Sequence, residues 1–218
     1  MTAEIIKLDL AHTETAFSRC REVVRAGGVL AYPTDTFYGL GVDPHDPRAI
    51  QRLFVVKGRQ ADQPILLLLA DAGAVKDWVA AVTPQAERLM QRFWPGPLTL
   101  VFTAKAGVPA ELTAGTGTIG LRVPGSAITR QLLAFLGTAL TGTSANRSGA
   151  QSPATAVQVV ESLGTGVDLV LDSGSTAGNR PSTVVDVRNE SPTVIREGAI
   201  LARDIAAQAL NSFTKAVP

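Results

Sequence analysis

Apolar residues fall into two patterns that alternate along the chain. Short runs of Val, Ile and Leu are typical of buried strands, whereas apolar residues three or four positions apart are typical of a helix with one buried face. Helices are predicted to begin near Thr13, Asp46, Asp71, Thr83, Ser126 and Ser152, and a last one to span 199–210. Strands are predicted over 5–10, 29–32, 65–70, 98–103, 118–123, 139–143, 167–171, 183–187 and 193–196.

This interleaving predicts an α/β domain with a mixed, twisted, open sheet and flanking helices. No low-complexity linker or internal repeat interrupts the chain, so we expect residues 1–218 to form a single domain without a second one. Consecutive strands without an intervening helix break strict alternation. A pure dinucleotide-binding fold or an eight-stranded barrel is therefore not expected.

Composition restricts the class of protein further. The 218 residues are 45% hydrophobic and 18% charged, as in an ordinary globular protein. Twenty Lys and Arg oppose 19 Asp and Glu, and the net charge of +1 argues against a broad nucleic-acid-coating surface while permitting a local basic pocket. Cys20 is the only cysteine, which excludes an internal disulfide and a cysteine-based zinc site.

The sequence also gives an expectation for location. The longest apolar run, 65–70, is far too short to span a membrane. The N-terminal residues are acidic and polar and do not resemble a signal peptide. We therefore expect a cytoplasmic protein.

One glycine-rich segment matches a known fingerprint in the wrong setting. Residues 115–120 read Gly-x-Gly-x-x-Gly, as dinucleotide-binding loops do. That fingerprint follows a strand and opens a helix. Here a strand is predicted directly after it, so we interpret the segment as a loop rather than a cofactor site.

A second segment, 32–41, leaves a predicted strand and carries groups suited to a ligand. It reads YPTDTFYGLG, with hydroxyl groups, one acid and two glycines. Glycine lets the backbone approach a ligand closely, and Thr hydroxyls both donate and accept hydrogen bonds. Taken alone, the segment fits a plain connecting loop equally well.

Two basic residues flank the end of the helix that Asp46 and Pro47 begin and Gly58 ends. Lys57 and Arg59 suit the negative end of the helix dipole, which is the simpler interpretation. Alternatively, they bind phosphate or carboxylate groups, for which Arg offers a bidentate fork.

Further polar residues follow predicted strands, where ligands bind in open α/β sheets. Ser144 and Asn146 follow one strand, and Ser152 stands at a predicted helix start, where it caps the helix, helps to bind an anion, or both. Arg122 and Arg196 lie in apolar strands. A buried Arg needs a partner, either a structural ion pair or a carboxylate of the substrate.

Together these segments resemble the threonylcarbamoyl-adenylate synthase family, the YrdC-like domain. The matching pieces, in chain order, are PTDTFYGLG, KGR followed by QP, WPGPLTLVF, TIGLRVP, TSANRSG, PSTVVDV and IREG. They run from about residue 6 to residue 200 and so cover nearly the whole chain. The resemblance implies a twisted open sheet with a basic concave pocket.

The resemblance also implies an activity. ATP, L-threonine and bicarbonate would give threonylcarbamoyl-AMP and pyrophosphate, for the threonylcarbamoyladenosine modification of tRNA together with downstream proteins. Such a nucleotidyltransferase would use Mg²⁺ carried by ATP and no metal ligands of its own. One alternative is a paralogue with another adenylate-forming activity. A second alternative is an RNA-binding module, and the near-zero net charge and few aromatic residues argue against this second one.

By position, the family's pattern gives roles to residues of this chain. Lys57 would neutralise phosphate or carbamate charge, and the catalytic set would be Lys57, Arg59, Ser144 and Asn146. Threonine would be held by Thr36, Arg122, the backbone of Gly142, and Ser182. ATP would be held by Arg59, Gln63, Thr118, Ser144, Asn146, Ser152 and Arg196. Two positions depart from the family: Gln60 replaces a common Pro, and Leu68 stands where some members have His.

Overall fold

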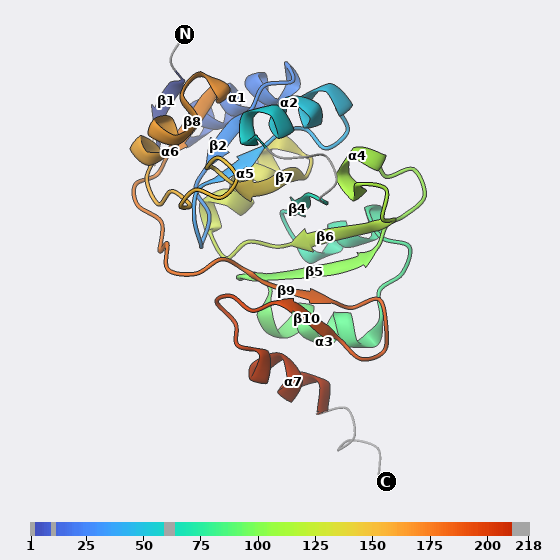
Figure 1. Cartoon of the computed structure of the whole chain (residues 1–218). Helices are drawn as coiled ribbons and strands as arrows, with labels where there is room; N and C mark the ends of the chain where they lie inside the picture. The colour runs from blue at the N-terminus through green and yellow to red at the C-terminus, as the bar shows by residue number, and fades with distance from the viewer. Residues whose placement is uncertain (1–2, 10–11, 59–63, 211–218) are drawn as a thin grey trace.

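The computed structural model describes residues 3–9, 12–58 and 64–210. Helices flank one large sheet, as the interleaved pattern predicts (Figure 1). The strands are β1 (Glu4–Lys7), β2 (Leu30–Tyr32), β3 (Gly39–Gly41), β4 (Leu66–Leu68), β5 (Leu98–Thr103), β6 (Thr118–Arg122), β7 (Leu140–Ser144), β8 (Leu169–Asp172), β9 (Thr183–Asp186) and β10 (Thr193–Arg196). The helices are α1 (Thr13–Arg25), α2 (Pro47–Lys57), α3 (Pro84–Phe93), α4 (Ala110–Thr113), α5 (Ala127–Leu136), α6 (Ala156–Leu163) and α7 (Ala202–Leu210), with 3-10 turns η2 (Ala72–Asp77) and η3 (Gly164–Gly166).

The described strands form a ten-stranded sheet in the order β1-β8-β2-β3-β7-β4-β6-β5-β9-β10. Four neighbouring pairs are parallel, namely β1/β8, β8/β2, β4/β6 and β5/β9. The other pairs are antiparallel, so the sheet is mixed, as predicted. Because β4 and β6 run in the same direction, their carboxyl ends, Leu68 and Arg122, meet at one edge.

Alternate residues of the strands feed two apolar cores, one on each face of the sheet. In β2, Leu30 and Tyr32 belong to one core and Ala31 to the other, as the two-residue period of a strand requires. The smaller core is closed by α1 and α5, which pack against each other. Helix α2 buries Ile50 and its apolar stripe in the larger core. The sheet thus carries an apolar core on each face, and residues of β4 and β7 beside the smaller core also line the site.

The ends of α2 are set by local chemistry, as predicted. The Asp46 carboxylate accepts hydrogen bonds from the backbone nitrogens of Arg48 and Ala49, and Pro47 occupies the first turn. Gly58 ends the helix with φ 58°, a left-handed conformation that glycine adopts without strain. These two ends place Lys57 in the last turn.

The main differences from the prediction concern four elements. β3 was expected to be loop, and α4 was not predicted. α6 does not start at Ser152: Thr155 caps it, and Thr155 and Gln158 form a reciprocal capping box. The prediction of a helix start at Ser152 is therefore wrong. The last helix begins at Ala202 rather than at residue 199.

Among the described helices, none combines the length and the apolar character that crossing a membrane would require.

Candidate active site

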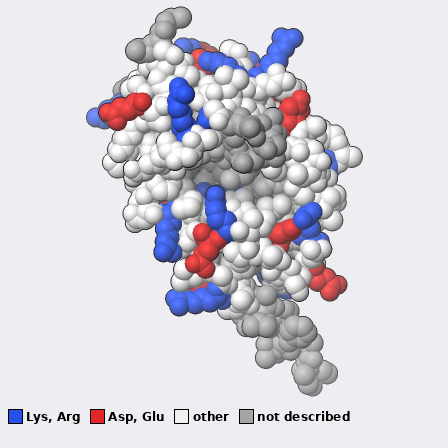
Figure 2. All heavy atoms as spheres, in the orientation of Figure 1, with Lys and Arg blue, Asp and Glu red and all other residues white. Residues whose placement is uncertain are grey.

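Residues of β4 and β7, the ends of other strands and several connecting loops line a cavity of about 300 Å³. Figure 2 shows a hollow near the middle of one face, with blue Lys and Arg side chains around it. The lining combines hydroxyl groups, two arginines and an apolar floor. It consists of Tyr32, Thr34, Thr36, Phe37, Tyr38, Gly39, Leu66, Leu68, Arg122, Gly142, Thr143, Ser144, Ser152, Pro181, Ser182 and Arg196.

A second hollow, of about 690 Å³, lies beyond the ends of β4 and β6. Its walls include Met90, Trp94 and the acidic Asp71 and Glu87. It contains none of the residues that the sequence predicts for a site. The smaller cavity is therefore the better candidate, because its chemistry rather than its size matches the predicted ligands.

Arg122 reaches the cavity from the last position of β6. Its Nε donates to the backbone oxygen of Gly96 across 2.9 Å, and its Nη2 pairs with Asp35 Oδ1 at 2.5 Å. Nη1 lies 3.4 Å from the Thr36 hydroxyl. Of the two partners that the sequence allows for this buried arginine, the structure provides the ion pair, and it also leaves Arg122 in the cavity wall.

The loop after β2 presents two hydroxyl groups to the same cavity. Thr34 Oγ1 accepts a hydrogen bond from the backbone nitrogen of Thr36 and donates to the backbone oxygen of Phe37. Thr34 and Thr36 hydroxyls are 3.0 Å apart. Both threonines are buried, and this local network fixes Thr36 beside Arg122.

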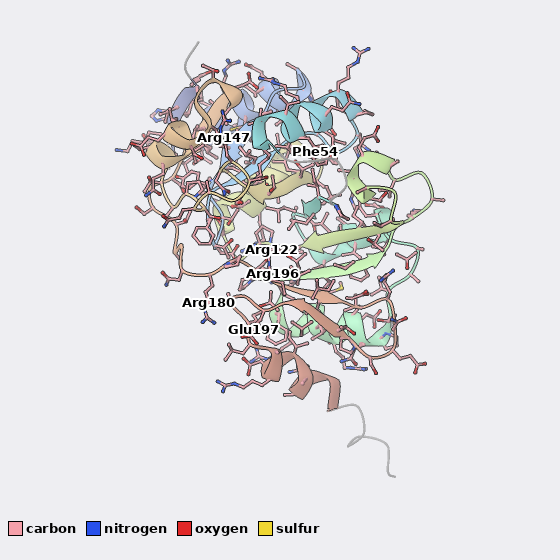
Figure 3. All side chains as sticks on the ribbon, in the orientation of Figure 1. Phe54, Arg122, Arg147, Arg180, Arg196 and Glu197 are labelled. Carbon is pink, nitrogen blue, oxygen red and sulfur yellow. The ribbon has the colours of Figure 1, made fainter. Side chains whose placement is uncertain are left out.

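Arg196 and Ser182 form a further part of the cavity wall. Nη2 of Arg196 donates to the backbone oxygen of Ser182 across 2.9 Å, and the Ser182 hydroxyl lies 2.9 Å from that of Thr99 on β5. Figure 3 shows Arg196 next to Arg122 at the same edge of the sheet. Burial lowers the pKa of Arg196, and the positive charge of Arg122 lowers it further. Two like charges held together in this way favour an anionic ligand.

Lys57 lies under the loop that follows β7. Its ammonium donates to the backbone oxygens of Ser144 and Asn146 across 2.6 and 2.7 Å. The backbone nitrogen of Ser148 donates in return to the backbone oxygen of Lys57. Lys57 is buried and is not part of the cavity lining. Its described contacts are therefore with the Ser144–Asn146 loop.

The remaining predicted residues divide into three groups. Gly142 and Ser152 line the cavity, with Ser152 in the segment before α6 rather than at its start. Asn146 donates to the backbone oxygens of Arg147 and Ala150, outside the lining, and Thr118 lies at the opposite end of β6 from Arg122. Arg59 and Gln63 lie outside the described residues.

Besides Thr34, three contributors to the site are not among the site residues that the sequence predicts. Asp35 and Thr99 hold Arg122 and Ser182, and the Tyr38 hydroxyl lies within hydrogen-bonding distance of Asp172 and of the Gly174 backbone oxygen. Burial raises the pKa of Tyr38, which keeps its hydroxyl protonated. Asp35 and its partner Arg122 are 87 positions apart in the sequence. The only local signal for Asp35 is therefore its place in the polar segment 32–41.

The described residues contain no group of three or more His, Cys, Asp or Glu side chains placed to hold a metal ion. What the arrangement offers is a basic, hydroxyl-rich cavity at the strand ends of a mixed α/β sheet. Such a cavity is suited to a small ligand that carries a carboxylate or phosphate.

Comparison with known proteins agrees with that class of protein. Residues 22–198 match the Sua5/YciO/YrdC family, which carries the description "Telomere recombination". The match covers well over half of the chain, and the chain belongs to this family.

Individual relatives carry more specific names. A Thiobacillus denitrificans protein named threonylcarbamoyl-AMP synthase is 41% identical over 75% of this chain and 87% of its own length. A Pyrococcus abyssi protein of the same name is 35% identical over 84% of this chain. The crystal structure of P. abyssi Sua5 complexed with L-threonine aligns with a TM-score of 0.89 and 31% identity over 95% of this chain. The chain spans only 54% of the P. abyssi relative's length and 61% of the chain in that crystal structure.

Proposed function

We propose that this protein is an L-threonylcarbamoyladenylate synthase. It would convert ATP, L-threonine and bicarbonate into threonylcarbamoyl-AMP and pyrophosphate, for threonylcarbamoyladenosine modification of tRNA. The observation that carries the proposal is that two arginines, Arg122 and Arg196, line one cavity together with Thr36 and Ser182. Arg122 contacts the Thr36 hydroxyl, and Arg196 contacts the backbone oxygen of Ser182. The names of the relatives, and the threonine complex of one of them, support it.

Threonine would bind at the Arg122 end of the cavity. Arg122 would receive its carboxylate, and Thr36, Ser182 and the backbone of Gly142 would contact the rest of the amino acid. All four residues line the cavity. Leu66 and Leu68 supply an apolar floor, which suits the methyl group of threonine.

ATP would extend from the Arg196 wall towards the loop after β7. The proposed contacts are Arg59, Gln63, Thr118, Ser144, Asn146, Ser152 and Arg196. Lys57 would act at this end, where its Nζ donates to the backbone oxygens of Ser144 and Asn146. We expect Mg²⁺ to arrive bound to the phosphates of ATP, since hard cations prefer oxygen ligands.

The reaction needs no covalent enzyme intermediate. The threonine nitrogen and bicarbonate give a carbamate with loss of water; a carbamate oxygen then attacks the α-phosphorus of ATP, forming the new P–O bond as pyrophosphate leaves. The site contributes positioning and charge stabilisation. This accounts for a cavity rich in Arg, Ser and Thr. On this proposal the protein is a nucleotidyltransferase.

We extend the proposal to the setting in which the enzyme acts. It would work in the cytoplasm and supply its product to tRNA-modification proteins.

The test is pyrophosphate release with each substrate left out in turn. We expect release only when ATP, threonine and bicarbonate are all present, and a large loss of rate in Arg122→Lys, which cannot form a bidentate fork. Arg188→Ala is the control, because Arg188 follows β9 and pairs with Asp186, the last residue of that strand, and neither residue lines the cavity. Release that does not depend on threonine would exclude the proposal.

A further inference from the structure

Asp35 lies directly behind the cavity wall. Its neighbours Thr34 and Thr36 line the cavity, and Asp35 does not. The Asp35 carboxylate pairs with Arg122, and the exposed fractions of the two side chains are 18% and 5%. Asp35 therefore reaches the site only through the guanidinium that it touches.

The position of the Asp35 carboxylate is fixed from two sides. On one side, the Thr34 hydroxyl closes the turn around it through bonds to Thr36 and Phe37. On the other side, a Cβ added at Gly125 would meet Asp35 Oδ2 at 2.9 Å and Cγ at 3.1 Å. The backbone at Gly125 thus packs tightly against the carboxylate, which leaves little room for it to move.

Arg122 depends on this carboxylate for its charge balance. Its other strong contact is the neutral backbone oxygen of Gly96. Arg196 adds a second positive charge in the same cavity, and the described lining contains no Asp or Glu. A buried arginine beside a like charge, with a neutral acceptor alone, would be costly to hold in place.

We propose that Asp35 is a positioning residue that holds the Arg122 guanidinium in its substrate-receiving orientation before the substrate binds. Because Asp35 engages Nη2 and the Gly96 oxygen engages Nε, the guanidinium is held on one side, with Nη1 beside Thr36 at the cavity. An arginine ordered in advance loses less conformational entropy when the carboxylate arrives. The inference rests on the proposed function for the identity of the substrate, threonine.

The matched variants are Asp35→Ala, Asp35→Asn and Asp186→Ala. Asp35→Asn keeps an oxygen that can accept from Nη2 but removes the charge. Asp186 is the control, since it also pairs with an arginine, is 15% exposed and lies outside the cavity lining. Steady-state rates then give kcat and the KM values for threonine and ATP separately.

The expected effect of Asp35→Ala is a selective rise in the KM for threonine. Asp35→Ala should raise the KM for threonine about tenfold or more, with kcat and the KM for ATP changed by less than about threefold, because a misplaced fork weakens one substrate. Asp35→Asn should lie between wild type and Asp35→Ala, and Asp186→Ala should match wild type. A wild-type threonine KM in Asp35→Ala, or equal rises in both KM values, would overturn the inference.

A substrate-free readout separates this inference from the proposed function. Hydrogen exchange of the Arg122 Nε–H, assigned by its loss in Arg122→Lys, reports whether the guanidinium is held. It should be at least about tenfold faster in Asp35→Ala than in wild type or Asp186→Ala, since an opened hydrogen bond exchanges freely. If wild type shows no threonine-dependent turnover, the proposed function fails, while unchanged Nε–H exchange in Asp35→Ala would overturn the positioning role by itself.

Discussion

The Lys57 ammonium donates a hydrogen bond to the backbone oxygen of Ser144 across 2.6 Å. This bond, with its companion to Asn146, ties the end of α2 to the loop after β7. From the sequence, Lys57 was a candidate for neutralising substrate charge. In the structure it also organises the loop from which two proposed ATP contacts come.

Lys57→Met should therefore lower the stability of the protein as well as the rate of the proposed reaction. Methionine fills similar space but leaves two backbone oxygens without their charged donor, at a cost of about 2 kcal/mol. Urea denaturation measures this change in the free energy of unfolding. Lys105→Met is the control, because Lys105 donates to a backbone oxygen at an exposed position, and it should change stability by less than about 0.5 kcal/mol. Equal stability of Lys57→Met and wild type would show that the loop does not need the ammonium.

Thr99→Val tests the support of Ser182. The variant preserves shape and removes the hydroxyl that lies 2.9 Å from the Ser182 hydroxyl. We expect the KM for threonine to rise about three- to tenfold, as the loss of one hydrogen bond of about 1 kcal/mol would give. Thr103→Val, at the exposed end of the same strand, should leave kinetics unchanged. A similar KM in both variants would mean that the Ser182 hydroxyl needs no partner.

Gly142→Ala tests how closely the backbone of β7 bounds the cavity. A Cβ at this position would lie 2.5 Å from Leu66 Cδ1 and 3.0 Å from Leu68 Cγ. Both leucines line the cavity, so their displacement should reduce activity about tenfold at a stability cost of about 1 kcal/mol.

A second substitution provides the control for Gly142→Ala. Leu66→Ala makes room for the added methyl group, so the double variant should recover part of the activity lost by Gly142→Ala. If the loss of activity in the double variant equals the sum of the losses in the two single variants, the packing explanation is contradicted.

Cys20 should be unreactive while the protein is folded. Burial raises the pKa of its thiol to about 12, so the nucleophilic thiolate is scarce at neutral pH, and the side chain has no exposed surface. A disulfide reagent should therefore label it slowly in buffer at pH 8 and rapidly in denaturing urea. Rapid labelling of the folded protein would show that α1 opens readily from the smaller core.

Local signals in the sequence predicted elements, but they did not predict the order of the sheet. Asp46, Pro47 and Gly58 act on neighbouring backbone groups, so the ends of α2 could be read directly. Ser152 was mistaken for a helix start because it is also a capping residue, and Thr155 with Gln158 forms the stronger pair. The sequence does not predict β3 because Gly-Leu-Gly lacks the β-branched and aromatic residues typical of strands, and pairing with β2 and β7 holds this strand in place.

For the candidate site, the structure shows which of the predicted residues lie together, and their roles stay predictions. Thr36, Arg122, Gly142, Ser144, Ser152, Ser182 and Arg196 all line one cavity. Thr118 and Asn146 lie outside the lining, and neither role is tested by that position alone. The partners that hold the site together, Asp35 and Thr99, follow from pairing between distant segments. No local pattern in a single sequence reports such pairing.

The identity of the product tests the proposed activity most directly. The protein is incubated with ATP, L-threonine and ¹³C-bicarbonate, and the adenylates are analysed by mass spectrometry. We expect threonylcarbamoyl-AMP carrying one ¹³C atom, in amounts equal to the pyrophosphate released, and none when threonine is omitted. An adenylate without the label, or pyrophosphate release without any threonine-containing product, would contradict the proposed activity.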